Sequence, residues 1–293
     1  MTTWAGVVLA GGRSSRMGAP KPALEWHGST LLRRTVGIVA RATGGPVVVV
    51  RASGQQLPPL PLGTVVVDDP REGKGPVQGI AAGLAALAAL GTPGTPASAA
   101  ETAFVSSTDL PFLHPAFIQC VLRALTEDAA DVALPVARGF RQPLAAAYRV
   151  SLAGTAERLV SAGRLRPALL FDECVVTRIG EARLRRDPVL AALDPALDSV
   201  RNVNSPADYL AARSLPAPEV AVAITGPAAA SRLRDGPLTV RAATVRGAAD
   251  AVGLAFGWPA SAVVNGDWVT SDGDTPLATG DIVAFSLPGD ASG

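Results

Sequence analysis

Short apolar segments of strand length alternate with longer segments of helical spacing over the first two thirds of the chain. The strand-length segments cover residues 5–9, 47–50, 65–67, 104–105 and 132–134, and the helical ones cover residues 31–42, 77–90 and 115–125. The strand-length segments are too apolar to have a solvated face, which favours a sheet covered by helices on both sides. The alternation therefore predicts an α/β fold, Rossmann-like and three-layered, around a mostly parallel sheet.

Composition argues against several kinds of partner. The 26 basic and 25 acidic residues are spread along the chain and give a formal net charge of +1, so we expect neither nucleic acid nor an anionic membrane surface to bind. No apolar run reaches the roughly 18 residues of a membrane span, and the first residues lack the basic stretch of a signal peptide, so we expect a cytoplasmic protein. Cys120 and Cys174 have no metal-ligand spacing. A small molecule is the expected partner.

A second domain is predicted at the C-terminal end. At 293 residues the chain exceeds the roughly 100 to 200 residues of one domain, and its pattern changes near Pro216 and Pro218. We predict domains at residues 1–214 and 219–293. The second has strand patterns near residues 220–224, 238–242, 262–264, 268–269 and 282–285, and a helical pattern at 247–256. This order predicts a small mixed sheet with one crossing helix, a β-grasp (ubiquitin-like) arrangement.

The loop from Leu9 to Lys21, LAGGRSSRMGAPK, directly follows the first predicted strand. Its glycines let the backbone turn sharply and aim N–H groups at an anion, while Arg13, Arg16 and Lys21 add positive charge. We interpret the loop as a triphosphate-binding site; a glycine turn with solvated arginines is the alternative. The expected substrate-binding residues here are Leu9, Ala10, Gly11, Gly12, Arg13 and Lys21.

Lysine is rare in this chain. Of the 26 basic residues only Lys21 and Lys74 are lysines, and both lie in glycine-rich loops. A bias towards arginine that has spared these two positions indicates a need for a compact, flexible point charge there. For Lys74, chance is the alternative.

Two further loops follow predicted strands, where ligands bind in open α/β sheets. Asp68 and Asp69 could accept hydrogen bonds from a base or a ribose, and Gly75 lets a base pack against bare backbone; a solvated turn before a helix is the alternative. Asp109 follows the strand at residues 104–105 and could supply one of the one or two carboxylates that a magnesium ion needs beside phosphate oxygens. Its alternative role is to cap the next helix.

Three of these segments together resemble a known enzyme family. LAGGRSSRMGAPKPAL, followed by Gly28 and Leu31-Leu32, is similar to the opening motif of the molybdenum cofactor guanylyltransferases, members of the nucleotidyltransferase superfamily. GPVQG at residues 75–79 resembles the family's Gly-Pro-Leu-Ala-Gly segment beside the guanine base, and SSTDLPF at 106–112 resembles its Cys-Asp-Met-Pro motif. The resemblance covers residues 4–212. It implies that Lys21 neutralises charge that builds up during transfer and that Asp109 binds the metal.

A later segment adds four candidate residues. RNVNSPAD at residues 201–208 resembles the family's Asn-Ile-Asn-Thr-Pro-Glu-Asp motif. On this resemblance Asn202 and Asn204 are substrate-binding candidates, because uncharged amides can contact phosphate and pterin without adding negative charge. The alternative is that Ser205-Pro206 simply begins a helix. Arg164 and Arg166 are candidates for a family arginine that faces the cofactor phosphate.

The resemblance implies an Mg²⁺-dependent enzyme that transfers GMP from GTP to molybdopterin or Mo-molybdopterin and releases pyrophosphate. Its catalytic residues would be Arg16, Lys21 and Asp109, with Asp109 as the metal ligand. Two alternatives remain open. One is cytidylyl or other nucleotidyl transfer to a phosphorylated acceptor, and the other is a non-catalytic carrier or docking protein that works through the C-terminal domain.

The C-terminal domain has a resemblance of its own. Residues 263–267 and 276–285 resemble the β-grasp sulfur carriers, in particular the small subunit of molybdopterin synthase. Those carriers end in Gly-Gly, whereas this sequence ends in Ser292-Gly293. The resemblance therefore implies either a sulfur carrier, a surface that docks other proteins of molybdenum cofactor biosynthesis, or a vestigial domain.

Overall fold

The computed structural model describes residues 4–11, 20–70, 73, 75–91, 100–225, 236–254, 261–269 and 272–286. The chain divides into two compact units, Met1–Leu24 with Leu31–Pro206, and Glu25–Thr30 with Ala207–Gly293. The predicted domain limits at residues 214 and 219 stay a prediction. Within the described ranges, no helix combines the length and the apolar character that crossing a membrane requires.

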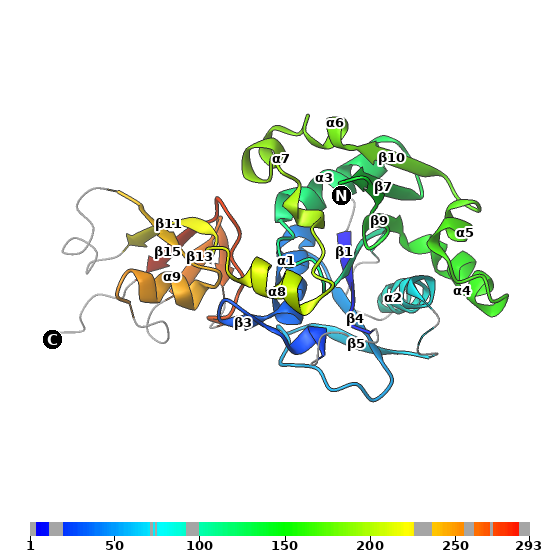
Figure 1. Ribbon diagram of the computed structural model, residues 1–293, viewed down its shortest axis with the longest axis horizontal. Helices are drawn as coiled ribbons and strands as arrows, with labels where there is room; N and C mark the ends of the chain where they lie inside the picture. Colours follow the sequence, from blue (N-terminus) through cyan, green and yellow to red (C-terminus); the bar gives the residue numbers. More distant parts are fainter. Residues whose placement is uncertain are drawn as a thin grey trace. The chain divides into compact units, whose positions relative to one another are not determined.

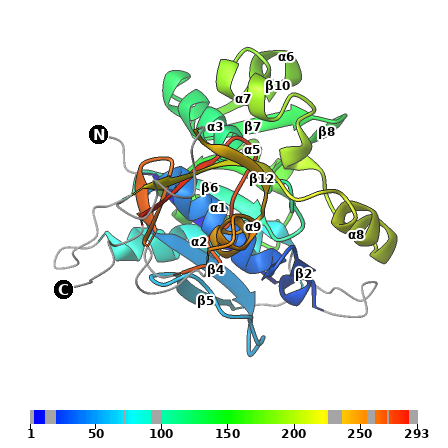
Figure 2. The ribbon, with the colours of Figure 1, turned by 90° about the vertical axis from the view of Figure 1, so that its left-hand side faces the viewer.

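An eight-stranded, mostly parallel sheet forms the centre of the first unit, as predicted (Figure 1). Its strands are β1 (Trp4–Leu9), β4 (Val47–Ala52), β5 (Val65–Asp69), β6 (Thr102–Ser107), β7 (Val132–Ala137), β8 (Phe140–Arg141), β9 (Ala145–Arg149) and β10 (Val176–Gly180). They run in the order β10-β7-β9-β6-β1-β4-β5, with β8 paired to β7. The neighbours β6-β1-β4-β5 are all parallel, and β7 is parallel to β10. Only β8 and β9 pair antiparallel to their neighbours within this sheet. Figure 2 shows β4 and β5 side by side at one end of the sheet.

Helices cover both faces of this sheet. The longer ones are α1 (Leu31–Thr43), α2 (Pro76–Leu90), α3 (Pro115–Glu127) and α4 (Ala153–Ser161). The short ones are η1 (Lys21–Ala23), η2 (Val150–Leu152), α5 (Pro167–Phe171), α6 (Glu181–Leu184), α7 (Pro188–Leu193) and η3 (Asp198–Val200).

Neighbouring residues of β1 show the two faces directly, because successive side chains of a strand point to opposite sides. A Cβ atom built on Gly6 would lie 2.2 Å from Cγ1 of Val39 in α1, whereas Val7 lies against α2, where a Cβ built on Gly83 would lie 2.3 Å from the Cγ1 of Val7. The absence of a side chain at Gly6 and Gly83 thus lets α1 and α2 approach the strand closely. The predicted three layers are confirmed (Figure 1).

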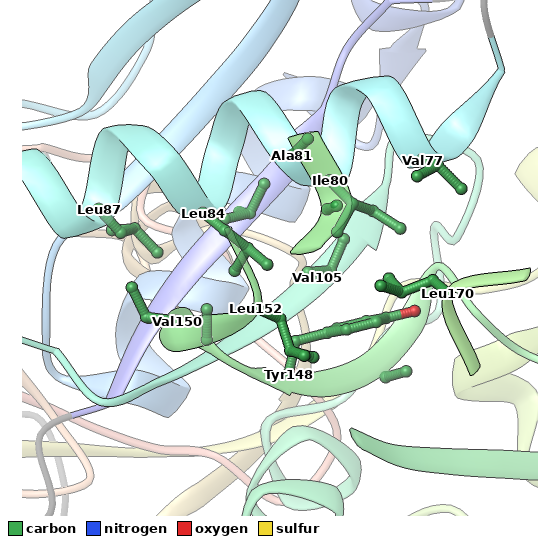
Figure 3. Close-up of a cluster of buried hydrophobic side chains, with 14 of the residues drawn as sticks. Val77, Ile80, Ala81, Leu84, Leu87, Val105, Tyr148, Val150, Leu152 and Leu170 are labelled. Atoms are coloured by element: carbon green, nitrogen blue, oxygen red, sulfur yellow. The ribbon is translucent and has the colours of Figure 1, made fainter. Parts of the chain in front are cut away.

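A cluster of buried side chains between α2 and the sheet forms one part of the core of the first unit (Figure 3). Its members include Val77, Ile80, Ala81, Leu84, Leu87, Val105, Tyr148, Val150, Leu152 and Leu170. Tyr148 is fully buried, and its hydroxyl donates a hydrogen bond of 2.7 Å to the carbonyl of Pro143. Burial raises the pKa of Tyr148, so the hydroxyl keeps its proton and the bond that fixes the segment before β9.

The second unit contains a separate five-stranded mixed sheet. The strands of this sheet are β11 (Glu219–Thr225), β12 (Leu238–Arg241), β13 (Ser261–Val264), β14 (Asp267–Val269) and β15 (Ile282–Ser286). The unit also contains helix α9 (Val245–Ala251) and the short paired strands β2 (Glu25–Trp26) and β3 (Ser29–Thr30). Helix α8 (Pro206–Arg213) belongs to this unit except for its first residue, Pro206. The sheet order is β12-β11-β15-β13-β14, and β11 and β15 are its one parallel pair. This is the mixed sheet with one accompanying helix that the sequence predicts. Its assignment to the β-grasp sulfur carriers stays a prediction.

Helix α9 is shorter than the helix predicted at residues 247–256. It begins at Val245, since the hydroxyl of Thr244 accepts a hydrogen bond from the Gly247 N–H and caps the helix. It ends at Ala251, because Gly253 adopts a φ of 69° and the Leu254 N–H turns back to the Ala249 carbonyl. The prediction followed the apolar spacing and missed this stop signal.

The hydrogen bonds of Asp128 should make the stability of the first unit depend on pH. The Asp128 carboxylate accepts hydrogen bonds from Arg183 in α6 and from Thr177 in β10, and these lower its pKa from 3.8 to about 2. A carboxyl group whose pKa is depressed on folding stabilises the fold above its unfolded pKa, and that stability is lost as the pH falls towards about 2. We therefore expect that, as the pH is lowered below about 4, the free energy of unfolding measured by urea titration falls less steeply in Asp128→Asn than in the wild type. Asp172→Asn is the control, and equal slopes in all three proteins would contradict the assignment.

Candidate active site

Two cavities of the first unit meet at Asp109. The first has a volume of about 530 Å³ and the second about 560 Å³. Asp109, Ser107 and Leu144 line both. Of the predicted site residues, the first cavity holds Leu9, Ala10, Gly11, Lys21, Asp69, Gly75 and Asp109, and the second holds Asp109, Asn202 and Asn204.

Asp109 lies just beyond the carboxyl end of β6, with its side chain 19% exposed. Ser107 donates a hydrogen bond to one carboxylate oxygen. The other oxygen, Oδ2, lies 3.4 Å from the Asn202 amide nitrogen and 3.9 Å from the Lys21 ammonium. The alternative role of Asp109 as a helix cap does not apply, because His114 caps α3 through its Nδ1, which accepts from the Ala116 N–H at 3.1 Å.

Lys21 connects three segments that are distant in the sequence. It begins the short helix η1, and its side chain is 19% exposed. Its ammonium group lies 3.9 Å from Asp109 and donates to the Asn204 side-chain oxygen at 3.4 Å. Lys21, one of the two lysines of the chain, therefore lines the first cavity and lies 3.9 Å from the carboxylate at which the two cavities meet.

Asn202 and Asn204 face the same side of an extended segment. Val203 between them is buried, and its N–H donates a hydrogen bond of 2.9 Å to the carbonyl of Asp109. Because alternate side chains of an extended chain point in the same direction, burial of Val203 turns both amides towards the cavity. Their amides contact Asp109 and Lys21 respectively.

The start of the opening loop lines the first cavity, and its backbone is firmly held. The Ala10 N–H donates to the Val50 carbonyl at 2.8 Å, and the Ala10 carbonyl accepts from the Gln55 side chain at 3.1 Å. Both backbone groups of Ala10 are thus used within the protein, and it contributes shape to the cavity. The Gln55 side chain also accepts a hydrogen bond from the Ala52 N–H, so it connects the opening loop to the end of β4. The predicted residues Gly12, Arg13 and Arg16 lie outside the described residues.

Asp68 and Asp69 point to different surroundings. Asp69 lines the first cavity. Asp68 forms an ion pair of 2.7 Å with Arg51 and lines neither cavity. Gly75 lines the first cavity with a φ of 80°, directly before Pro76 begins α2. The positive end of the α2 dipole therefore lies at this cavity, which favours an anion there.

Neither Arg164 nor Arg166 lines either of the two cavities at Asp109. Arg164 forms an ion pair with Glu173, and Arg166 is an exposed residue at the start of α5. The structure thus does not bring these two predicted residues to Asp109.

The second cavity is also lined by residues that the sequence did not predict as site residues. Arg138, Phe140 and Arg141 belong to the β7–β8 hairpin and line this cavity beside Arg201. A two-residue turn in a hairpin usually carries Asn-Gly or Asp-Gly, and the Arg138-Gly139 pair lacks that signal. The Arg-Gly step before an aromatic residue is the one hint that the sequence offers.

The donors around Asp109 fit a magnesium ion. Magnesium takes one or two protein carboxylates and draws its other ligands from phosphate and water. Asp109 offers one oxygen, Oδ2, beside the neutral amide of Asn202. Within the part of the chain that the structure describes, no three His, Cys, Asp or Glu side chains gather into a metal site built from protein alone.

The chain is similar to known nucleotidyltransferases. A family model described as MobA-like NTP transferase domain matches residues 6–175. A Mycobacterium bovis protein named probable molybdenum cofactor guanylyltransferase is 38% identical over 177 residues, which cover 60% of this chain and 82% of the relative. The structure of the molybdopterin-guanine dinucleotide biosynthesis protein A from Archaeoglobus fulgidus matches with a TM-score of 0.55 and 21% identity, over 71% of this chain and 96% of that one. A nucleotidyl transferase from Methanothermobacter matches with a TM-score of 0.50 and 21% identity, over 73% and 97%. The two structural matches support the fold.

Proposed function

The chain belongs to the MobA-like NTP transferase family, and from this premise we propose that it transfers GMP from GTP to molybdopterin and releases pyrophosphate. The observation that carries the proposal is the meeting of two cavities at Asp109, with Lys21 lining the first cavity and Asn202 the second, both close to its carboxylate. A nucleotidyl transfer needs two substrate sites that share one reacting point, and these cavities supply that arrangement. The reaction is a step of molybdenum cofactor biosynthesis, and a cytoplasmic location is part of the same proposal.

The chemistry requires no nucleophile from the protein. An oxygen of the terminal phosphate of molybdopterin forms a bond to the α-phosphorus of GTP, and the bond from that phosphorus to the bridging oxygen of the β-phosphate breaks. Pyrophosphate leaves with the electron pair. In such reactions positioning and charge stabilisation supply nearly all of the rate enhancement.

Each element of the site has a role in this proposal. The Lys21 ammonium, with the first turn of α2, stabilises negative charge on the triphosphate. Asn202 and Asn204 orient the acceptor phosphate without repelling it. Asp109 would hold Mg²⁺, which when bound neutralises charge on the phosphate oxygens.

The choice of base is tested by comparing nucleotides. With molybdopterin and Mg²⁺ present, we expect the full chain to form a guanylylated product from GTP, detected by mass spectrometry, and to turn over CTP far more slowly. A preference for CTP would favour the cytidylyl alternative. Absence of product with either nucleotide would favour a carrier or docking protein. The role of the second unit, whose tail Ser292-Gly293 lies outside the described residues, stays a prediction.

A further inference from the structure

The β7–β8 hairpin has an unusual turn. Ala137 of β7 pairs with Phe140 of β8, so only Arg138 and Gly139 connect the strands. Both have positive φ, 54° and 80°. A left-handed conformation is uncommon for arginine and persists only where its surroundings hold it.

A hydrogen bond and an ion pair from other elements hold this turn in place. The Arg138 N–H donates to a Glu181 side-chain oxygen at 2.7 Å, and the Arg138 guanidinium forms an ion pair of 3.2 Å with Asp198. Both partners belong to short elements that follow β10 in the sequence. The turn is therefore fixed from two separate segments.

The returning strand is fixed as well. The Gln142 N–H donates to the Pro135 carbonyl at 2.9 Å, and its side-chain amide donates to the Ala137 carbonyl at 3.1 Å. One residue further, the buried Tyr148 hydroxyl holds the Pro143 carbonyl. Such a hairpin presents its side chains with little conformational freedom left to lose on binding.

The side chains presented are an exposed ring and a guanidinium. Phe140 is 72% exposed, and it lines the second cavity together with Arg141. Arg201, which also lines this cavity, lies over the Phe112 ring, 5.2 Å from its centroid. No carboxylate of the described residues lies within ion-pair distance of Arg141 or Arg201, whereas Arg138 has Asp198. An exposed ring beside two guanidinium groups without a counter-charge suits a ligand that is both flat and anionic.

We propose that the β7–β8 hairpin is the acceptor-binding platform of this enzyme: Phe140 packs against the flat pterin ring, while Arg141 and Arg201 bind the negative charge of the acceptor. This inference rests on the proposed function, which makes a phosphorylated pterin the acceptor. The nucleotide then occupies the first cavity, and the acceptor phosphate reaches Asp109 from the second.

The test measures acceptor binding separately from turnover. Anaerobic calorimetric titration of molybdopterin into the full chain gives its Kd, and a parallel titration gives the Kd of GTP. We expect Phe140→Leu to raise the molybdopterin Kd about fivefold, as for a lost stacking contact. We expect Arg141→Gln to raise it about tenfold, as for a lost charge-assisted hydrogen bond. Phe140→Tyr keeps the ring and should bind like the wild type. The matched control is Arg178→Gln, an exposed arginine of β10 that lines neither cavity.

The outcomes separate this inference from the proposed function. An unchanged molybdopterin Kd in Phe140→Leu and Arg141→Gln, with melting temperatures equal to the wild type, would overturn the platform even if the wild type forms product. A raised GTP Kd with an unchanged molybdopterin Kd would also overturn it, because the hairpin would then serve the nucleotide. Conversely, weakened molybdopterin binding in a protein that never forms product would support the platform and refute the proposed transfer.

Discussion

Asp109→Asn is expected to reduce kcat for guanylyl transfer by about a thousandfold or more, because the substitution removes the carboxylate that, among the described residues, lines both cavities. Asparagine keeps the size of the side chain and one oxygen. The Asn202 amide, 3.4 Å away, can still donate to that oxygen. The loss would therefore come from the missing negative charge. Initial rates of pyrophosphate release with saturating GTP, molybdopterin and Mg²⁺ measure the effect.

Stability should change little in this variant. The hydrogen bond that ties the Val203 N–H to residue 109 uses the backbone carbonyl and survives the substitution. A thermal melt equal to that of the wild type thus separates catalysis from folding. Asp172→Asn, which removes a carboxylate outside both cavities, serves as the matched control. If Asp109→Asn kept most of the wild-type kcat, Asp109 would have no place in the proposed chemistry.

The parallel half of the sheet could be predicted because its strands are almost wholly apolar. Residues 47–50 are four consecutive valines, and the structure buries every one of them. The strands β8 and β10 could not be predicted in this way. Phe140 and Arg141 of β8 are exposed, and β10 buries only Ile179 fully, so neither carries the pattern of a covered strand.

At the candidate site, too, the sequence pattern could not predict the direction of some side chains. The Asp68-Asp69 pair indicated a carboxylate in the cleft, but not which of the two lies there. β5 pairs only with β4 and is partly exposed on both faces, so the apolar pattern sets no direction for its side chains. The contact between Arg51 and Asp68 settles it, and that contact arises only when β4 and β5 pair.

Asn202 and Asn204 were predicted from the family resemblance, and both line the second cavity. A single apolar residue, Val203, stands between two amides, and its burial determines where both point. Arg164 and Arg166 also flank a single apolar residue, Leu165, which packs against the core, yet neither arginine lines the two cavities at Asp109. The resemblance that suggested them is one of sequence, whereas their position depends on how α4 and α5 pack.

The second large effect is expected for Lys21→Arg, which keeps the positive charge. We expect kcat to fall about a hundredfold, because a planar, rigid guanidinium replaces the compact ammonium of a side chain that is only 19% exposed. Only 3.9 Å separate the ammonium from Asp109, and 3.4 Å separate it from the Asn204 oxygen. A guanidinium there can bind the carboxylate with two parallel hydrogen bonds and so block the oxygens that the chemistry needs.

Comparison with Lys21→Ala separates the loss of charge from the change of shape. If shape matters as proposed, arginine rescues little of the activity that alanine loses, in initial rates at saturating GTP. Arg178→Lys, the reverse exchange outside both cavities, should behave like the wild type. A Lys21→Arg variant close to wild-type activity would show that any cation suffices. The survival of lysine at this position, in a chain that otherwise uses arginine almost throughout, would then have no physical cause in the geometry around Asp109.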